Sequence, residues 1–306
     1  MAERILKMNK WMKEILFGVF FVIFVFNSPA FSNQETDEIN AAIKEKKAKW
    51  TAGETTITKL SEQDRQKRLG LIPSKSAEEN YTATELQSVP SLFDWRNYNG
   101  NFVTPIRDQG NCGSCWAFAT TAALESHELI INNTPGINLD LSEQMLVCCS
   151  SSGSCSGGYV NTSSDYIRDT GLPIEDCCPY TATNNSCSLN TCTKNCIDLH
   201  TIRGWHWVTK SVENLKSELY TYGPLIVDMR VYKDFFSYQS GIYSKVKGSY
   251  QGDHAILIVG YNDAGQYFIV KNSWGTGWGE SGYFRIAYSE LISVVKFANS
   301  NIAYEN

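Results

Sequence analysis

The chain has 306 residues, which is long enough for a substantial core and about two domains. Its formal net charge of −5 leaves no excess of basic side chains, so no nucleic-acid partner is expected. Ten cysteines are more than a typical reduced cytosolic protein carries. They favour an oxidising compartment, which would be extracellular (secreted) or the lumen of a lysosome-like or periplasmic compartment.

The N-terminus has the pattern of a secretory signal peptide. Basic residues precede a continuous apolar run of twelve residues, 15–26, whereas a membrane span needs about 20. Small residues at Ala30 and Ser32 then fit a signal-peptidase site, so we expect removal of residues 1–32. An uncleaved anchor is the alternative. No later segment is apolar enough to span a bilayer, so no stable membrane insertion is expected after cleavage.

Residues 33–88 differ in character from the rest, because they are rich in Lys, Glu, Thr and Gln and contain no cysteine. Ile39, Ala42 and Ile43 are spaced for one face of a short helix. Trp50 is a lone aromatic residue before a turn signal at Ala52-Gly53. This composition fits either a disordered linker or a segment that docks on the rest of the chain.

A helix is predicted to begin near Cys115, where a glycine-containing stretch gives way to the small and aromatic residues 116–124. Cys115 would then lie in the first helical turn. Backbone N–H groups there lack helical partners and the helix dipole is positive, and both features stabilise a thiolate. The position therefore suits a nucleophilic cysteine.

Helical and loop signals continue to about residue 198. Residues 141–147 form a candidate helix with a start signal at Ser142-Glu143, and residues 159–168 form another. Residues 150–158 read as a loop rich in Ser and Gly, and residues 177–196 as cysteine-rich and irregular.

The second half of the chain has strand signals. Four short β-branched or aromatic runs are bounded by Gly or Asn: 225–231, 255–261, 267–270 and 283–287. A helix-rich half followed by a strand-rich half predicts an α+β protein of two subdomains, about 89–198 and about 199–306. Cys115 lies in the first, and His254 and Asn272 in the second. A site that uses all three would lie in the cleft between the subdomains.

Seven sequence blocks occur in the order found in one enzyme family. They are residues 90–96, 109–118, 141–144, 155–159, 179–180, 253–255 and 272–280. From about residue 90 to the C-terminus, the chain thus resembles the papain family of cysteine peptidases, which includes the cathepsins. The resemblance implies a papain-like fold with a helical half and an antiparallel β-rich half. It also makes 89–306 the peptidase domain and 33–88 a pro-segment, similar to the short ones of cathepsin B-like enzymes.

The resemblance implies a Cys-His-Asn mechanism. Cys115 would attack the amide carbonyl as a thiolate, and His254 would take its proton and later pass it to the leaving amine. Asn272 would orient the imidazole. Gln109 would donate its side-chain N–H to the oxyanion beside the backbone N–H of Cys115. The other three histidines, His127, His200 and His206, lack such a setting and are expected to be surface or ordinary core residues.

Substrate is expected to lie in an extended conformation along Gly157 and Gly158. Asp253 and Trp274 complete the candidate binding residues, and Trp274 would also shield the bond between His254 and Asn272 from water. The resemblance further implies the disulfides Cys112–Cys155 and Cys149–Cys187. A bond from Cys148 to Cys177 or Cys178 is plausible, as is Cys192–Cys196, and one thiol should remain unpaired.

We therefore expect a cysteine endopeptidase that acts on peptides or proteins, is made as a secreted zymogen, is inhibited by its own pro-segment and needs no cofactor. A zinc site in the cysteine-rich stretch is a rival, but no paired CxxC spacing supports it. A catalytically dead binding protein would have lost Cys115, His254 or Asn272, and none is lost. Another thiol acyl-transfer enzyme, such as a transglutaminase-like protein, fits the surroundings of Gln109 and Asn272 less well.

Overall fold

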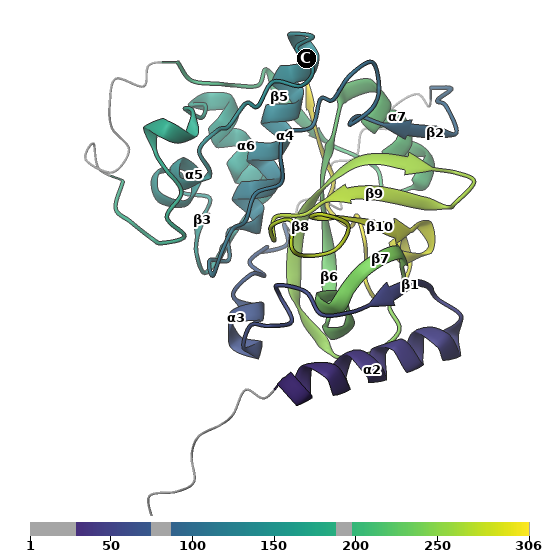
Figure 1. The fold of residues 1–306 in the computed structure, drawn as a ribbon. Coiled ribbons are helices and arrows are strands. Elements are labelled where there is room, and N and C mark those ends of the chain that lie inside the picture. Colours follow the sequence, from purple (N-terminus) through teal and green to yellow (C-terminus); the bar gives the residue numbers. More distant parts are fainter. Residues whose placement is uncertain (1–28, 75–86, 188–197, 306) are drawn as a thin grey trace, which may run out of the picture.

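The computed structural model describes residues 29–74, 87–187 and 198–305 (Figure 1). The predicted signal peptide, residues 1–32, therefore lies almost wholly outside the described residues. So does the suggested Cys192–Cys196 pair. Within the described ranges, none of the helices combines the length and the apolar character that crossing a membrane requires.

Three helices form one side of the molecule, around the long helix α4 (Cys115–Ile131). The helices α5 (Glu143–Cys149) and α6 (Val160–Asp169) pack against it. Small residues such as Ala117, Ala119 and Ala123 allow this close packing, and most of α4 is buried. The helix α5 begins where the sequence predicts, because the Ser142 hydroxyl accepts a hydrogen bond from the Met145 N–H. The short strands β3 (Gly153–Ser154) and β4 (Gly157–Gly158) pair between α5 and α6.

The other side is a nine-stranded sheet with the order β1-β7-β10-β9-β8-β6-β11-β5, in which β2 also pairs with β8. Its longest strand, β8 (Tyr250–Asn262), pairs antiparallel with β6 (Leu225–Tyr232) and β9 (Tyr267–Lys271). The other strands are β2 (Leu92–Asp94), β5 (Gly204–Trp207), β7 (Tyr238–Tyr243), β10 (Tyr283–Ala287) and β11 (Ile302–Glu305). The helix α7 (Val212–Tyr222) and 3-10 turns at Glu175–Cys177, Lys233–Ser237 and Tyr288–Leu291 complete the fold.

The main contact between the two sides runs between α4 and β8. The apolar residues 255–259 of β8 are all buried there, which explains why this strand reads as a continuous apolar run. A second cluster of aromatic rings, formed around Phe235, Trp274 and Trp278, fills the space beside β7 and β10. The contact between α4 and β8 brings the chain around Cys115 to the chain around His254.

The N-terminal part of the chain docks on the sheet. The helix α2 (Pro29–Lys46) lies along the lower edge in Figure 1 and is followed by β1 (Lys49–Ala52) and α3 (Glu62–Gln66). The strand β1 pairs antiparallel with β7 and so becomes the edge strand. Trp50 is buried against Tyr238 and Tyr243, and its indole N–H donates to the Ser244 carbonyl at 2.9 Å. The described part of residues 33–88 is therefore docked, which excludes a disordered linker for it.

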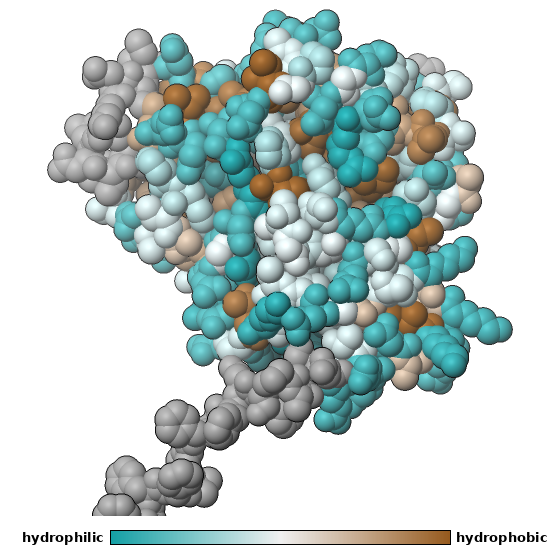
Figure 2. Space-filling view, in the orientation of Figure 1, coloured by the Kyte–Doolittle hydropathy of each residue, from teal (hydrophilic) through white to brown (hydrophobic). Residues whose placement is uncertain are grey.

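Figure 2 shows that the apolar side chains on one face lie in small, separated groups among polar ones. The large apolar area of this protein is instead in the core, which includes the N-terminal residues Ile39, Ile43, Trp50 and Ile57. Residues 33–74 thus contribute to the same core as the rest of the chain.

Candidate active site

Cys115 is the first residue of α4, as the sequence predicts, and its side chain is completely buried. Ser114 stands at the N-cap but makes no side-chain capping bond. Four backbone N–H groups act on the Cys115 thiol and lower its pKa: those of Ala255 in β8, of Gly70 in the docked N-terminal segment, and of Cys115 and Trp116 at the start of α4. The candidate nucleophile therefore lies where three parts of the chain meet.

His254 lies in β8, and Asn272 directly follows the neighbouring strand β9. The His254 Nε2 atom is 2.8 Å from the Asn272 Oδ1 atom, and both side chains are buried. The same Oδ1 atom accepts the Ser273 N–H, which fixes the amide orientation. Because an amide oxygen can only accept, Nε2 must be the donor in this bond, and neutral His254 carries its proton on Nε2. The other ring nitrogen, Nδ1, has no hydrogen-bond partner among the described residues and can take a proton.

Trp274 covers this pair. Its ring centroid is 4.8 Å from that of His254 and the two planes are inclined by 33°. Its other neighbours are Phe235, Phe236 and Trp278, and Trp274 itself is fully buried. This packing excludes water from the bond between His254 and Asn272. The sequence predicts that Trp274 shields this bond from water, and the position of its ring is consistent with that role.

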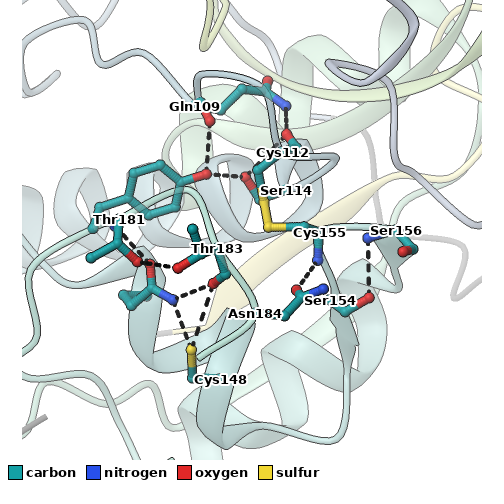
Figure 3. The surroundings of a disulfide bond; sticks show 12 residues. Gln109, Cys112, Ser114, Cys148, Ser154, Cys155, Ser156, Thr181, Thr183 and Asn184 are labelled. Carbon is teal, nitrogen blue, oxygen red and sulfur yellow. Dashed lines mark hydrogen bonds between the residues drawn. A yellow bond between two sulfur atoms is a disulfide. The ribbon is translucent and has the colours of Figure 1, made fainter. Parts of the chain in front are cut away.

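Gln109 is held by hydrogen bonds at both ends of its side chain. Its Oε1 atom accepts the Ser273 hydroxyl at 2.7 Å, and its Nε2 atom donates to the Cys112 carbonyl at 2.8 Å (Figure 3). The second hydrogen of Nε2 points to the Arg68 carbonyl, 3.1 Å away. An amide fixed in this way presents one N–H group to whatever oxygen occupies the position of the Arg68 carbonyl.

Tyr180 joins the loop of Gln109 to the start of α4. Its hydroxyl is 2.8 Å from the Gln109 carbonyl oxygen and 2.6 Å from the Ser114 hydroxyl. Its ring packs edge-on against Phe118, with the centroids 4.8 Å apart. The sequence marked residues 179–180 only as a block of the family resemblance and missed this contact. No local pattern could reveal it, because the partners are 66 and 71 residues away.

After a turn at Lys67 and Arg68 the chain crosses the site, and residues 70–72 pair with it in extended form. The Gly70 carbonyl accepts the Gly158 N–H at 2.9 Å, and the Ile72 N–H donates to the Gly158 carbonyl at 2.9 Å. The Leu71 N–H donates to the Asp253 carbonyl at 3.2 Å. Leu71 forms a parallel bridge with Gly158. Gly157, Gly158 and Asp253 thus bind an extended segment of the chain itself, and the contact made by Asp253 is through its backbone.

Glycine is required where this segment passes Cys112–Ser114. A Cβ atom on Gly70 would lie 1.9 Å from the Gly113 carbonyl oxygen, and one on Gly158 would lie 2.5 Å from the Trp116 ring. Gly157 has a positive φ of 127°. The segment therefore runs in backbone contact with the chain beside Cys115, closer than any side chain would allow.

Burial has the largest effect on the pKa values of Cys115 and His254. It raises the pKa of the Cys115 thiol to about 11, although backbone hydrogen bonds from Ala255 and Gly70 act in the opposite direction. Burial also lowers the pKa of the His254 imidazole to about 4, although the Asn272 bond opposes this. Both groups are therefore neutral near pH 7 in this covered state. The acidic thiol expected from the helix start is absent here because desolvation outweighs the favourable N–H groups.

The structure has the disulfides Cys112–Cys155 and Cys149–Cys187 (the first is shown in Figure 3). The suggested bond from Cys148 to Cys177 or Cys178 is wrong. Among the described residues the free cysteines are Cys115 and Cys148, while Cys177 and Cys178 are both disulfide-bonded. The Cys148 sulfur instead accepts a hydrogen bond from the Gln144 amide at 2.7 Å. Because Cys148 is the second-last residue of α5, its direction is set by that helix.

The other histidines have ordinary partners. His206 lies between Glu218 and Glu305, at 2.9 and 3.0 Å, and His200 is 3.5 Å from Glu128. His127 is buried in α4. In the described part of the chain, no group of three or more His, Cys, Asp or Glu side chains is arranged to hold a metal ion.

Comparisons with known proteins agree with this geometry. Residues 89–303 match the family model described as papain family cysteine protease. A cathepsin L-like proteinase of Fasciola hepatica is 39% identical over 208 residues, which cover 66% of this chain and 61% of the relative. A cathepsin B-like CP2 of Giardia intestinalis is 31% identical over 279 residues, which cover 85% of this chain and 90% of the relative.

The structure of a digestive procathepsin L2 proteinase from Tenebrio molitor larval midgut superposes with a TM-score of 0.76. It is 27% identical, and the match covers 97% of this chain and 99% of that one. The chain spans about three fifths of the length of the first curated relatives that it matches. The matches confirm the predicted α+β fold and family, while a pro-segment of the cathepsin B-like kind stays a prediction. The chain belongs to the papain family of cysteine proteases.

Proposed function

We propose that the chain is the precursor of a cysteine endopeptidase. Residues 1–32 are a signal peptide, 33–88 an inhibitory pro-segment and 89–306 the peptidase domain. The observation that carries the proposal is the passage of residues 68–72 through the site. The Gly70 backbone N–H acts on the Cys115 thiol, and the Arg68 carbonyl accepts a hydrogen bond from the Gln109 side-chain amide. A segment in this position excludes any substrate.

In the mature enzyme Cys115 is the nucleophile. Removal of the pro-segment readmits water to Cys115 and His254, which removes the desolvation that keeps both groups neutral. The thiol proton then passes to Nδ1 of His254, and the thiolate attacks the peptide carbonyl. Asn272 holds the ring so that Nδ1 faces the sulfur. His254 later returns the proton to the leaving amine, so that the leaving group lies on the side of His254 and Trp274.

Gln109 stabilises the oxyanion. Its Nε2–H, fixed by Ser273 and Cys112, already holds a carbonyl oxygen at 3.1 Å in the precursor. Gly157 and Gly158 bind the acyl side of an extended peptide through their backbone groups, and Asp253 and Trp274 line the remaining wall. Substrates are peptides or proteins, and no cofactor takes part.

The direction of the pro-segment is the opposite of the one that a productive substrate needs. Its chain runs from Arg68 on the side of Gln109 and Trp274 to Ile72 on the side of Gly158. A substrate has its leaving group on the side of His254 and Trp274, and so it runs the opposite way. The segment therefore occupies the cleft without presenting a peptide bond in the productive orientation.

Acid weakens the contacts of the pro-segment. Glu38 pairs with Lys247 at 2.7 Å, and this bond lowers the Glu38 pKa from its ordinary value. A lowered carboxyl pKa means that the contribution of the pair is present near neutral pH and is lost as the pH falls through that pKa. We propose a secreted or lysosome-like acidic setting for activation, with cleavage between about Tyr81 and Ser91.

The test is to express residues 33–306 as wild type and as Cys115→Ala and then to lower the pH. The wild type should shorten to a form that starts near residue 90 and gain activity on peptides. The Cys115→Ala variant should do neither. A precursor that is fully active at neutral pH without shortening would overturn the inhibitory role of residues 33–88.

A further inference from the structure

An ion pair lies inside the proposed substrate cleft. The Arg68 guanidinium is 2.5 Å from the Asp108 carboxylate through Nη1 and Oδ1, and only 9% of the Arg68 side chain is exposed. Arg68 belongs to the segment that crosses the site, whereas Asp108 belongs to the peptidase domain. The contact thus shows where the cleft itself accepts a cationic side chain.

Asp108 is placed on the leaving-group side of Cys115. It immediately precedes Gln109 in the sequence and forms an antiparallel bridge with Trp274, the residue that packs on His254. A Cβ atom on Gly275 would lie 3.1 Å from the Asp108 Oδ2 atom. Since the imidazole of His254 must reach the leaving amine, residues after the cleaved bond pass close to Asp108.

The carboxylate of Asp108 is held in place before any substrate arrives. Its Oδ1 atom accepts the Gly110 N–H at 2.9 Å, which fixes the side chain in a short turn. The neighbouring Arg107 pairs with Asp140 at 2.8 Å instead. Even beside Arg68, 51% of the Asp108 side chain is exposed, and removal of Arg68 uncovers more of the carboxylate.

We propose that Asp108 is a specificity-determining residue that selects Arg or Lys at one of the first two positions after the cleaved bond. This preference rests on the proposed peptidase function. When the pro-segment leaves, Asp108 loses its cation but keeps its position, and a substrate Arg or Lys restores the pair. Glu or Asp at the same positions is disfavoured, because two carboxylates repel each other at short range.

The expected size follows from the setting of the pair. Exposed ion pairs contribute little, whereas charge-assisted hydrogen bonds that are partly desolvated contribute more. The Arg68 side chain is mostly buried and the Asp108 side chain is half exposed, so the contribution of this pair should lie between these two cases. We expect kcat/KM to be about tenfold higher for an Arg peptide than for its Gln counterpart, and the ratio should fall as the ionic strength rises.

The experiment compares three mature enzymes: wild type, Asp108→Asn and Asp169→Asn. In Asp108→Asn the amide oxygen of the new side chain can still accept the Gly110 N–H, so the turn should persist while the charge is lost. Asp169, a surface carboxylate paired with Arg168 at the end of α6, is the charge-matched control. Internally quenched peptides of one sequence carry Arg, Lys, Gln, Leu or Glu at each of the two positions, and mass spectrometry identifies the cleaved bond.

The readout is the Arg-to-Gln ratio of kcat/KM, which does not change when a variant loses activity in general. Wild type and Asp169→Asn should both give a ratio near ten, and Asp108→Asn a ratio within twofold of one. Hydrolysis by the wild type without this preference, or a preference that survives in Asp108→Asn, would overturn the assignment of Asp108 alone. Failure of the wild type to hydrolyse any peptide would overturn the proposed function as well.

Discussion

The side-chain amide of Gln109 donates a hydrogen bond to the backbone carbonyl of Arg68, 3.1 Å away and 41 residues earlier in the chain. The group proposed to stabilise the oxyanion is thus occupied by a backbone oxygen of the same chain. In the same segment, the Gly70 backbone N–H acts on the Cys115 thiol, and the Leu71 N–H donates to the Asp253 carbonyl. One short stretch therefore covers the candidate nucleophile, the candidate oxyanion donor and the backbone groups that would bind substrate.

Cys115→Ser should abolish peptide hydrolysis and leave the fold intact. The side chain is buried and the two residues differ by one atom, so packing changes little, but a hydroxyl is far less acidic than a thiol. Steady-state assays on a fluorogenic peptide measure the loss, and thermal unfolding of the same sample measures the fold. Substantial turnover by the pure variant would contradict the assignment of Cys115 as nucleophile.

Asn272→Ala should reduce kcat less than His254→Ala does. The imidazole is also held by Trp274, so it keeps part of its orientation without Asn272, whereas nothing replaces the proton acceptor. Mature enzymes carrying each substitution should be compared at equal concentrations of folded protein. Equal losses would show that the amide does more than orient the ring.

Gln109→Ala should cost roughly 2–4 kcal/mol of transition-state stabilisation, as for other oxyanion donors. The loss should lie in kcat, because the negative oxygen exists only after the attack. Full Michaelis–Menten curves separate kcat from KM. An effect confined to KM would remove Gln109 from the oxyanion site and make it a binding residue.

Tyr180→Phe should lower kcat about three- to tenfold and leave KM within twofold. The variant keeps the ring on Phe118 but loses the hydroxyl that links the Gln109 carbonyl to Ser114, and one such bond contributes about 1 kcal/mol. Tyr304→Phe is the matched control, because it removes a buried hydroxyl near Ser164 instead. A loss of thermal stability with unchanged kcat would make Tyr180 a structural residue only.

The covered state should weaken as the pH falls from about 6.5 to about 4. Burial lowers the pKa of His254 to about 4, so between these values the opened state binds a proton that the covered state does not. The covered state is therefore most favoured above pH 6.5 and loses at most about 3 kcal/mol by pH 4, because Trp274 still covers part of the His254 ring after opening. Hydrogen exchange of the amides of residues 70–72 in the Cys115→Ala precursor measures the opening.

The control for this prediction is His254→Gln in the same Cys115→Ala background, since glutamine is polar but does not titrate near pH 6. The pH midpoint of opening should move at least about half a pH unit lower. The pH dependence that remains is then due to carboxylates such as Glu38. Identical midpoints in the two precursors would show that His254 has no part in acid opening.

Local patterns predicted the elements that carry the site. The helix at Cys115, the N-cap at Ser142 and the strands around Ala255, Tyr267 and Tyr283 all occur in the structure. These segments have strong apolar periodicity and are buried in the core, so tertiary packing reinforces the local preference. The family resemblance then supplied His254 and Asn272, which local patterns alone could not pair with Cys115.

The sequence did not predict contacts between distant segments. The strand β1 forms only because Lys49–Ala52 finds the edge of β7, and Trp50 finds its pocket between Tyr238 and Tyr243. The pair of Arg68 and Asp108 likewise needs α3 to end beside the Gln109 loop. The Cys148 bond was mistaken because cysteine counting cannot tell which way Gln144 and Cys148 point on α5.

The most direct measurement treats the mature enzyme with an epoxide thiol inhibitor and maps the adduct by peptide mass spectrometry. Cys148, the second free cysteine of the described residues, is partly exposed and serves as an internal control. We expect one adduct on Cys115, complete loss of peptide hydrolysis in step with it, and no adduct on Cys115 in the unprocessed precursor at neutral pH. An adduct on Cys148 that abolishes activity, or full activity with Cys115 modified, would contradict the assignment of Cys115 as the nucleophile.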